Sequence, residues 1–133
     1  MKTMTRKTTF FRDEDHHSRF VQAVHQLGKT WPEHGNKFDP EYGAALYILT
    51  TMFWESAQTH ISRHGIDFEA LTSGPLSTGE RVLLKWVANL FNWGNEGVYG
   101  AELMDLDEAN FALALTALQM RRFGYREEEG GAQ

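Results

Sequence analysis

A chain of 133 residues has the length of one domain, and its 41% of hydrophobic and 13% of aromatic residues suffice for one core. The absence of cysteine excludes disulfide bonds, thiolate metal sites and a cysteine nucleophile. The net charge of −5 is uneven: residues 1–35 hold six Lys or Arg against four Asp or Glu, and residues 36–133 hold seven against fourteen. A broad nucleic-acid-binding surface needs basic residues, and the larger part of the chain has few.

The expected organisation is a single helical domain over 11–124, between a flexible N-terminus over 1–10 and a disordered tail over 125–133. The first eleven residues contain no apolar run of the kind that a secretory signal requires. No stretch approaches the roughly eighteen apolar residues of a membrane span. We therefore expect a cytoplasmic protein without membrane contact, and no motif indicates a cofactor.

The first helix is predicted over 13–27. Its first turn holds three carboxylates, which the positive end of a helix dipole favours. Phe20, Val24 and Leu27 recur at helical spacing, and Gly28 is a typical stop.

His16 and His17 lie in the first turn of this predicted helix. Adjacent residues on a helix point about 100° apart, so at most one of the two can pair with Asp13. We therefore expect both histidines in a solvated first turn.

The second helix is predicted to begin at Asp39 and Pro40, because Asp caps the first amides and Pro fits the first helical position. An apolar stripe follows: Tyr42, Ala45, Leu46, Leu49, Met52 and Phe53. The helix either continues through 54–64 or breaks near Thr50 and Thr51, and Gly65 ends it in both cases. If part of the stripe over 40–53 stayed exposed, it would favour a homodimer.

Two further helices have clear starts. Ser77 and Glu80 form a capping box, and apolar residues follow at helical spacing: Leu83, Trp86, Val87, Leu90 and Phe91. The last helix starts at Asp107 and is apolar nearly all round, as is typical of the centre of a bundle. The predicted fold is therefore all-α, a compact bundle of four or five helices with the 108–123 helix central.

His60 and His64 are four residues apart on a predicted helix, so both imidazoles could face one metal ion. The zinc-protease pattern requires Glu directly after the first His, and Ile61 occupies that place. A third ligand would have to come from Glu55, Asp67 or Glu69. The alternative is that both histidines are ordinary surface residues.

Residues 93–105 form a predicted acidic loop that is a candidate partner-binding surface. It combines Trp93 and Tyr99 with Glu96, Glu102 and Asp105. Aromatic anchors within a polar rim are typical of protein recognition, and the carboxylates favour a basic partner. The alternative is that both aromatic rings are buried at the end of the bundle.

Several segments resemble a small family of bacterial proteins of unknown function. The similar segments are 10–16, 19–20, 45–49, 76–81, 89–92 and 106–111, and the resemblance covers most of residues 10–123. It implies a helical fold and assigns no catalytic residue. It also implies a link to mobile or phage-like elements.

The preferred hypothesis is a non-enzymatic, small protein-binding or inhibitor protein. Its concrete form is an inhibitor, encoded by a mobile element, of a prokaryotic immune complex of the anti-CRISPR kind. One alternative is a metal-dependent enzyme that uses His60 and His64. Another is a nucleic-acid-binding accessory protein whose basic N-terminal residues contact phosphates: Arg6, Lys7, Arg12 and Arg19.

Overall fold

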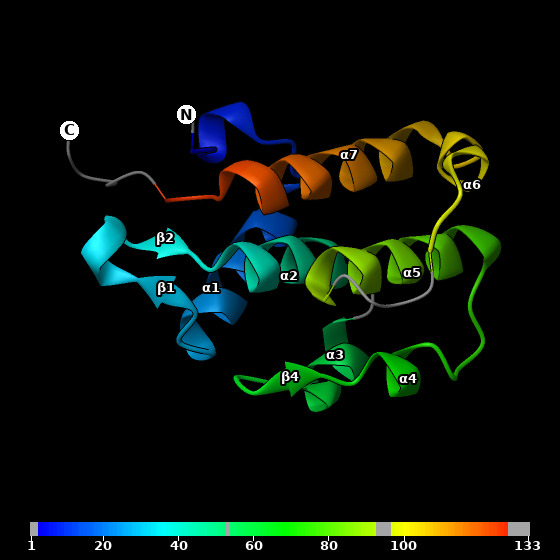
Figure 1. The fold of residues 1–133 in the computed structure, drawn as a ribbon, viewed down its shortest axis with the longest axis horizontal. Helices are drawn as coiled ribbons and strands as arrows, with labels where there is room; N and C mark the ends of the chain where they lie inside the picture. The colour runs from blue at the N-terminus through cyan, green and yellow to red at the C-terminus, as the bar shows by residue number, and fades with distance from the viewer. Residues whose placement is uncertain (1–2, 53, 93–96, 128–133) are drawn as a thin grey trace.

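Four long helices dominate the fold (Figure 1). They are α1 (Glu14–Gln26), α2 (Pro40–Met52), α5 (Thr78–Asn92) and α7 (Glu108–Phe123). Three short α-helices lie between them: α3 (Trp54–Ala57), α4 (Phe68–Leu71) and α6 (Gly100–Met104). This computed structural model describes residues 3–52, 54–92 and 97–127. The predicted all-α fold is confirmed.

Two small antiparallel hairpins accompany the helices. β1 (Thr30–Trp31) pairs with β2 (Lys37–Phe38), and β3 (Ile61–Ser62) pairs with β4 (Gly65–Ile66). In the first hairpin Gly35 has a φ of 71°, a conformation that glycine adopts without steric cost. The sequence did not indicate either hairpin, because two residues are too few to show the alternation of a strand.

The predicted helix starts are confirmed by hydrogen bonds at their first turns. The Asp13 carboxylate accepts from His16 N–H at 2.8 Å, and that of Asp107 accepts from Asn110 N–H at 2.8 Å. The Asp39 carboxylate accepts from two amides, Glu41 N–H at 2.9 Å and Tyr42 N–H at 3.2 Å. The capping box is complete, since Ser77 Oγ accepts from Glu80 N–H at 3.1 Å and Ser77 N–H donates to Glu80 Oε1 at 2.9 Å. Each cap satisfies amides that have no partner inside the helix.

The centre of the bundle is α2, where the sequence had placed the 108–123 helix. Every residue from 42 to 50 is buried, and α2 packs against α1, α3, α5 and α7. α7 packs against α2, α5 and α6, but three of its large apolar side chains are exposed. Both helices are rich in apolar residues, and only the packing shows which one is covered on all sides. Tyr42, Ala45, Leu46 and Leu49 of the predicted stripe are therefore covered within the chain, whereas the side chain of Met52 and all of Phe53 lie outside the described part of the structure.

The two ends of the described chain contradict the expected flexible start and disordered tail. Met4 and Tyr125 form a parallel bridge, and both belong to the hydrophobic core. Met4 N–H donates to the Gly124 carbonyl at 3.0 Å, and Arg126 N–H donates to the Met4 carbonyl at 2.9 Å. The segments 1–2 and 128–133 lie outside the described residues. The chain therefore needs residues from both ends to complete its core.

Within the described part of the chain, no helix combines the length and the apolar character that a membrane crossing requires. The longest of these helices, α7, has 16 residues and carries two arginines in its last turn.

Candidate functional site

The predicted partner-binding surface lies around α6. Tyr99 precedes the helix and is 79% exposed, so it does not fill the end of the bundle. Met104, at the end of α6, is 73% exposed. Trp93 and Glu96 lie outside the described residues. Two large apolar side chains are therefore presented to solvent within five residues of each other.

Glu102 holds α6 in place. Its Oε1 accepts from Tyr99 N–H at 3.0 Å, and its Oε2 accepts from Lys85 Nζ of α5 at 3.0 Å. The bond from the Tyr99 amide, followed by the bond from Lys85, lowers the pKa of Glu102 below its ordinary value. The predicted site residue Glu102 thus has a structural role, since it caps α6 and joins it to α5.

The surface around Tyr99 and Met104 is negative. Asp105 and Asp107 are exposed next to α6, and Asp107 also caps α7. No basic residue occurs in the sequence between Lys85 and Arg121, and the ammonium group of Lys85 is paired with Glu102. The predicted Asp105 therefore contributes to an acidic margin beside two exposed apolar side chains.

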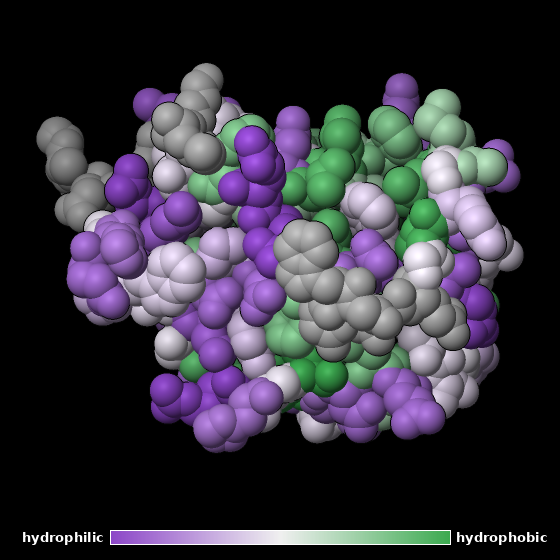
Figure 2. Space-filling view, in the orientation of Figure 1, coloured by the Kyte–Doolittle hydropathy of each residue, from purple (hydrophilic) through white to green (hydrophobic). Residues whose placement is uncertain are grey.

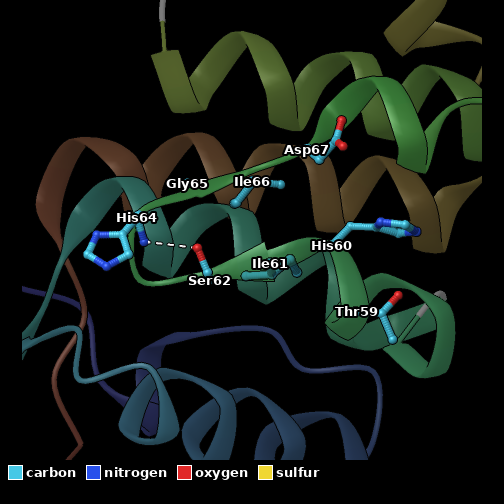
Figure 3. Close-up of a pocket in the computed structure, with 8 residues that line it drawn as sticks. All are labelled: Thr59, His60, Ile61, Ser62, His64, Gly65, Ile66 and Asp67. Carbon is cyan, nitrogen blue, oxygen red and sulfur yellow. Dashed lines mark hydrogen bonds between the residues drawn. The ribbon is translucent and has the colours of Figure 1, made fainter.

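His60 and His64 do not share a helix, which corrects the geometry behind the metal hypothesis. α2 ends at Met52, α3 spans Trp54–Ala57, and His60 ends the 3-10 turn Gln58–His60. His64 lies in the turn between β3 and β4. Figure 3 shows the two imidazoles at opposite ends of the hairpin, pointing away from each other.

The carboxylates near this hairpin do not complete a metal site. Asp67 caps α4 by accepting from Ala70 N–H at 3.0 Å. Among residues 3–52, 54–92 and 97–127, no group of three or more His, Asp or Glu side chains could hold a metal ion. His60 and His64 lie beside a shallow hollow, shown in Figure 3, without converging on one point in it.

Zinc titration tests the metal hypothesis directly. Because two diverging imidazoles cannot both bind one ion, we expect a His60→Ala, His64→Ala double variant to bind Zn²⁺ as the wild type does. Isothermal titration calorimetry of both proteins measures this, with His25→Ala as the control for a single exposed histidine. A binding heat that only the double variant loses would reinstate the metal site.

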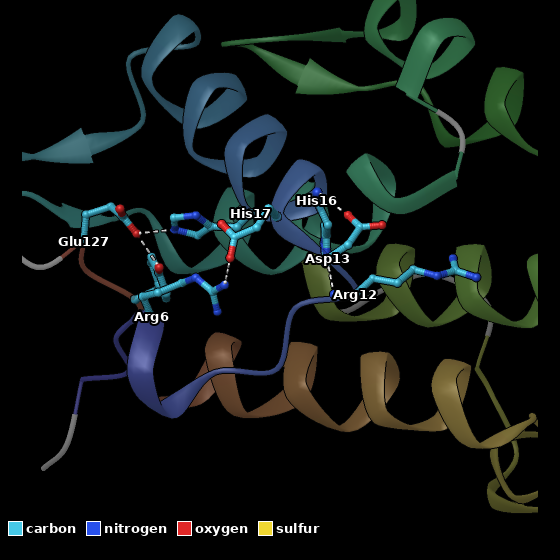
Figure 4. A network of polar contacts seen from close by, with 8 residues as sticks. Arg6, Arg12, Asp13, His16, His17 and Glu127 are labelled. Carbon is cyan, nitrogen blue, oxygen red and sulfur yellow. Dashed lines mark hydrogen bonds and ion pairs between the residues drawn. The ribbon is translucent and has the colours of Figure 1, made fainter.

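Two of the four N-terminal cations considered for nucleic-acid binding are held by the chain itself. Arg6, labelled in Figure 4, pairs with Glu14 at 3.0 Å. Its guanidinium also lies over the ring of Phe11. Arg19 Nε donates to the Thr50 carbonyl at 3.1 Å. Lys7 and Arg12 are exposed, so the basic surface is smaller than the sequence indicates.

His16 is buried, contrary to the expectation of a solvated first turn. Its Nε2 lies 2.6 Å from the Tyr47 carbonyl, and its Nδ1 accepts from Arg12 N–H at 3.0 Å. A carbonyl can only accept and an amide can only donate, so the neutral imidazole with hydrogen on Nε2 satisfies both. His16 therefore joins α1, α2 and the segment before α1. Figure 4 shows it beside Arg12 and Asp13 at the start of α1.

Burial lowers the pKa of His16 to about 4, and the bond to the Tyr47 carbonyl opposes this shift only in part.

The sequence contained a signal that His16 is buried, because it lies four residues before Phe20 and eight before Val24, on the same face of the helix. His17 is half-buried, with Nε2 at 2.9 Å from Glu127 Oε2.

A second exposed apolar group lies on α7. Phe111, Leu115 and Leu118 are 37%, 46% and 43% exposed. Figure 2 shows hydrophobic side chains gathered along the upper edge of the molecule, over α7 and α6.

Comparison of the chain with protein-family models, curated proteins and solved structures found no match. The resemblance to a bacterial family stays a prediction.

Proposed function

We propose that the protein is a non-enzymatic binding protein that recognises a basic surface of a protein partner through α6. The observation that carries the proposal is the exposure of Tyr99 and Met104 beside the carboxylates of Asp105 and Asp107. Tyrosine and methionine are enriched at protein interfaces, because they release much apolar surface from water when a partner covers them.

The way in which α6 is attached supports this role. Glu102 caps the helix and binds Lys85, so α6 presents Tyr99 and Met104 on a defined backbone. A surface that is ordered before binding loses less conformational entropy when the complex forms. The acidic margin would orient a basic partner and speed its approach.

In its most specific form, the proposed partner is a component of a prokaryotic immune complex. Such complexes hold nucleic acid in positively charged channels, and an acidic protein surface would compete for the same cations. Two features support this choice of partner: the acidic margin of α6 and the resemblance to proteins of mobile elements.

An affinity capture compares the wild type with a Tyr99→Ala, Met104→Ala double variant, using lysate of the cells that contain the protein. Trp31→Ala is the matched control, since Trp31 is an exposed aromatic residue on the β1–β2 hairpin. We expect the double variant to lose a partner that the wild type and the control both retain. We also expect rising salt to release that partner, because about 1 M salt shortens the Debye length to roughly 3 Å.

Circular dichroism must show that the double variant keeps its helices. If a folded double variant then captures every partner that the wild type captures, α6 is not the binding surface. If the lost partner is acidic rather than basic, the proposed charge complementarity is wrong.

A further inference from the structure

The outer face of α7 has the pattern of a coiled-coil seam. Glu108, Phe111, Leu115, Leu118 and Arg122 follow one another at spacings of three, four, three and four residues. These spacings are those of the a and d positions of a heptad repeat. Glu108 and Arg122 lie at the two ends of the seam, and the three large apolar residues lie between them.

The inner face of α7 is already used by the bundle. Leu113, Ala114, Ala117 and Met120 are buried. The seam lies on the other side, where its three apolar side chains are between 37% and 46% exposed. The other elements of the described chain therefore leave these side chains in contact with water. Figure 2 shows hydrophobic side chains along the upper edge of the molecule, where α7 lies.

The charges at the two ends of the seam favour an antiparallel copy of the same helix as its binding partner. Glu108 and Arg122 are both exposed, and fourteen positions separate them on the helix. An identical seam laid antiparallel places each Glu108 opposite the Arg122 of the other copy. A parallel arrangement would place like charges together, which is unfavourable. The seam is thus complementary to itself in the antiparallel direction.

A hollow beside the seam fits the same arrangement. It has a volume of about 490 Å³ and is lined by residues of α5 and α7, among them Trp86, Leu90 and Leu118. Trp86 Nε1 donates to the Ala114 carbonyl at 2.9 Å, which fixes one wall of the hollow. In an antiparallel pair centred on Leu115, Phe111 of one copy lies opposite Leu118 of the other, next to this hollow.

We propose that the α7 seam binds a second copy of this chain in an antiparallel, two-fold symmetric dimer centred on Leu115. A two-fold contact uses the same surface on both copies, and this seam meets that condition in apolar pattern and in charge. The proposal does not depend on the α6 surface, because Tyr99 and Met104 are not part of the seam. A dimer would carry two α6 surfaces and so engage a repetitive partner with increased avidity.

Sedimentation equilibrium over a range of protein concentrations tests the dimer. The wild type is expected to show a monomer–dimer equilibrium, and Leu115→Glu is expected to be monomeric, because it places two carboxylates at the two-fold axis. Position 115 is exposed, so the substitution leaves the buried core unchanged. Gln22→Glu is the control, since it adds a carboxylate to an exposed position on α1.

Charge reversal tests the direction of the pair. Glu108→Arg alone and Arg122→Glu alone are each expected to weaken dimerisation by roughly 2- to 30-fold, as for two exposed ion pairs per dimer. The two substitutions combined are expected to restore it, because the opposite charges again face each other. This recovery distinguishes the antiparallel dimer from a parallel one, in which like charges meet in the combined variant too.

A wild type that stays monomeric at every accessible concentration overturns the inference. So does a folded Leu115→Glu variant that dimerises as the wild type does. If the seam instead binds a different protein, the wild type is monomeric and captures that protein from lysate. The Leu115→Glu variant then loses this partner, and the Tyr99→Ala, Met104→Ala variant keeps it.

Discussion

A Tyr125→Ala variant is expected to lose about 3–5 kcal/mol of unfolding free energy, the range measured for removal of a large buried ring. Tyr125 is fully buried, although it lies beyond the last helix. Its ring centre lies 6.0, 5.2 and 5.1 Å from those of Phe11, Phe20 and Phe38. Its removal would leave a cavity bounded by α1, β2 and the segment before α1.

Urea unfolding followed by circular dichroism measures this loss. Phe10→Ala is the matched control, since Phe10 is a large aromatic residue that is 40% exposed, and its variant should lose much less stability. If Tyr125→Ala and Phe10→Ala unfold at the same urea concentration, the C-terminal segment does not belong to the core.

The second large effect concerns pH. The folded state is expected to lose up to roughly 3 kcal/mol of stability through His16 as pH falls from about 6.5 to about 4. In the unfolded chain His16 takes up a proton near its ordinary pKa of 6.5, whereas burial in the folded state delays protonation until about pH 4. The contribution is therefore fully present above pH 6.5 and is lost as pH falls towards the folded pKa.

A His16→Gln variant isolates this effect from other groups that titrate in acid. Its side-chain amide has a donor for the Tyr47 carbonyl and an acceptor for Arg12 N–H, but it does not titrate. When the pH falls from 7.5 to 4.5, we expect the unfolding free energy of the wild type to decrease by more than that of His16→Gln. His64→Gln, an exposed control, should follow the wild type. If the unfolding free energies of the wild type and His16→Gln change with pH in parallel, His16 is protonated without cost in the folded state.

The helices were the most predictable part of this fold because their signals are local. Asp39 with Pro40, Ser77 with Glu80, and Asp107 each mark a start that depends on atoms within three residues. Such hydrogen bonds need no tertiary contact, so residue type and spacing predict them.

The candidate surface was predicted in part. Tyr99 and Asp105 lie exposed near α6, as a binding surface requires, but Glu102 is occupied with Lys85 and the α6 cap. Met104 was missed, because an apolar residue in a short helix gives no sign of being exposed. His60 and His64 were given a shared helix because their spacing fits one, whereas the chain turns into β3 directly after His60.

The sequence by itself determined the helical class, the three capped starts and the acidic character of the region around α6. Only the tertiary structure decided which helix is central, that Met4 and Tyr125 complete the core, that His16 is buried, and that Phe111, Leu115 and Leu118 are not. The physical reason is that capping and helical periodicity depend on neighbours along the chain. Burial depends on which elements pack together, and an apolar side chain has the same local pattern whether its face of the helix is covered or left to water.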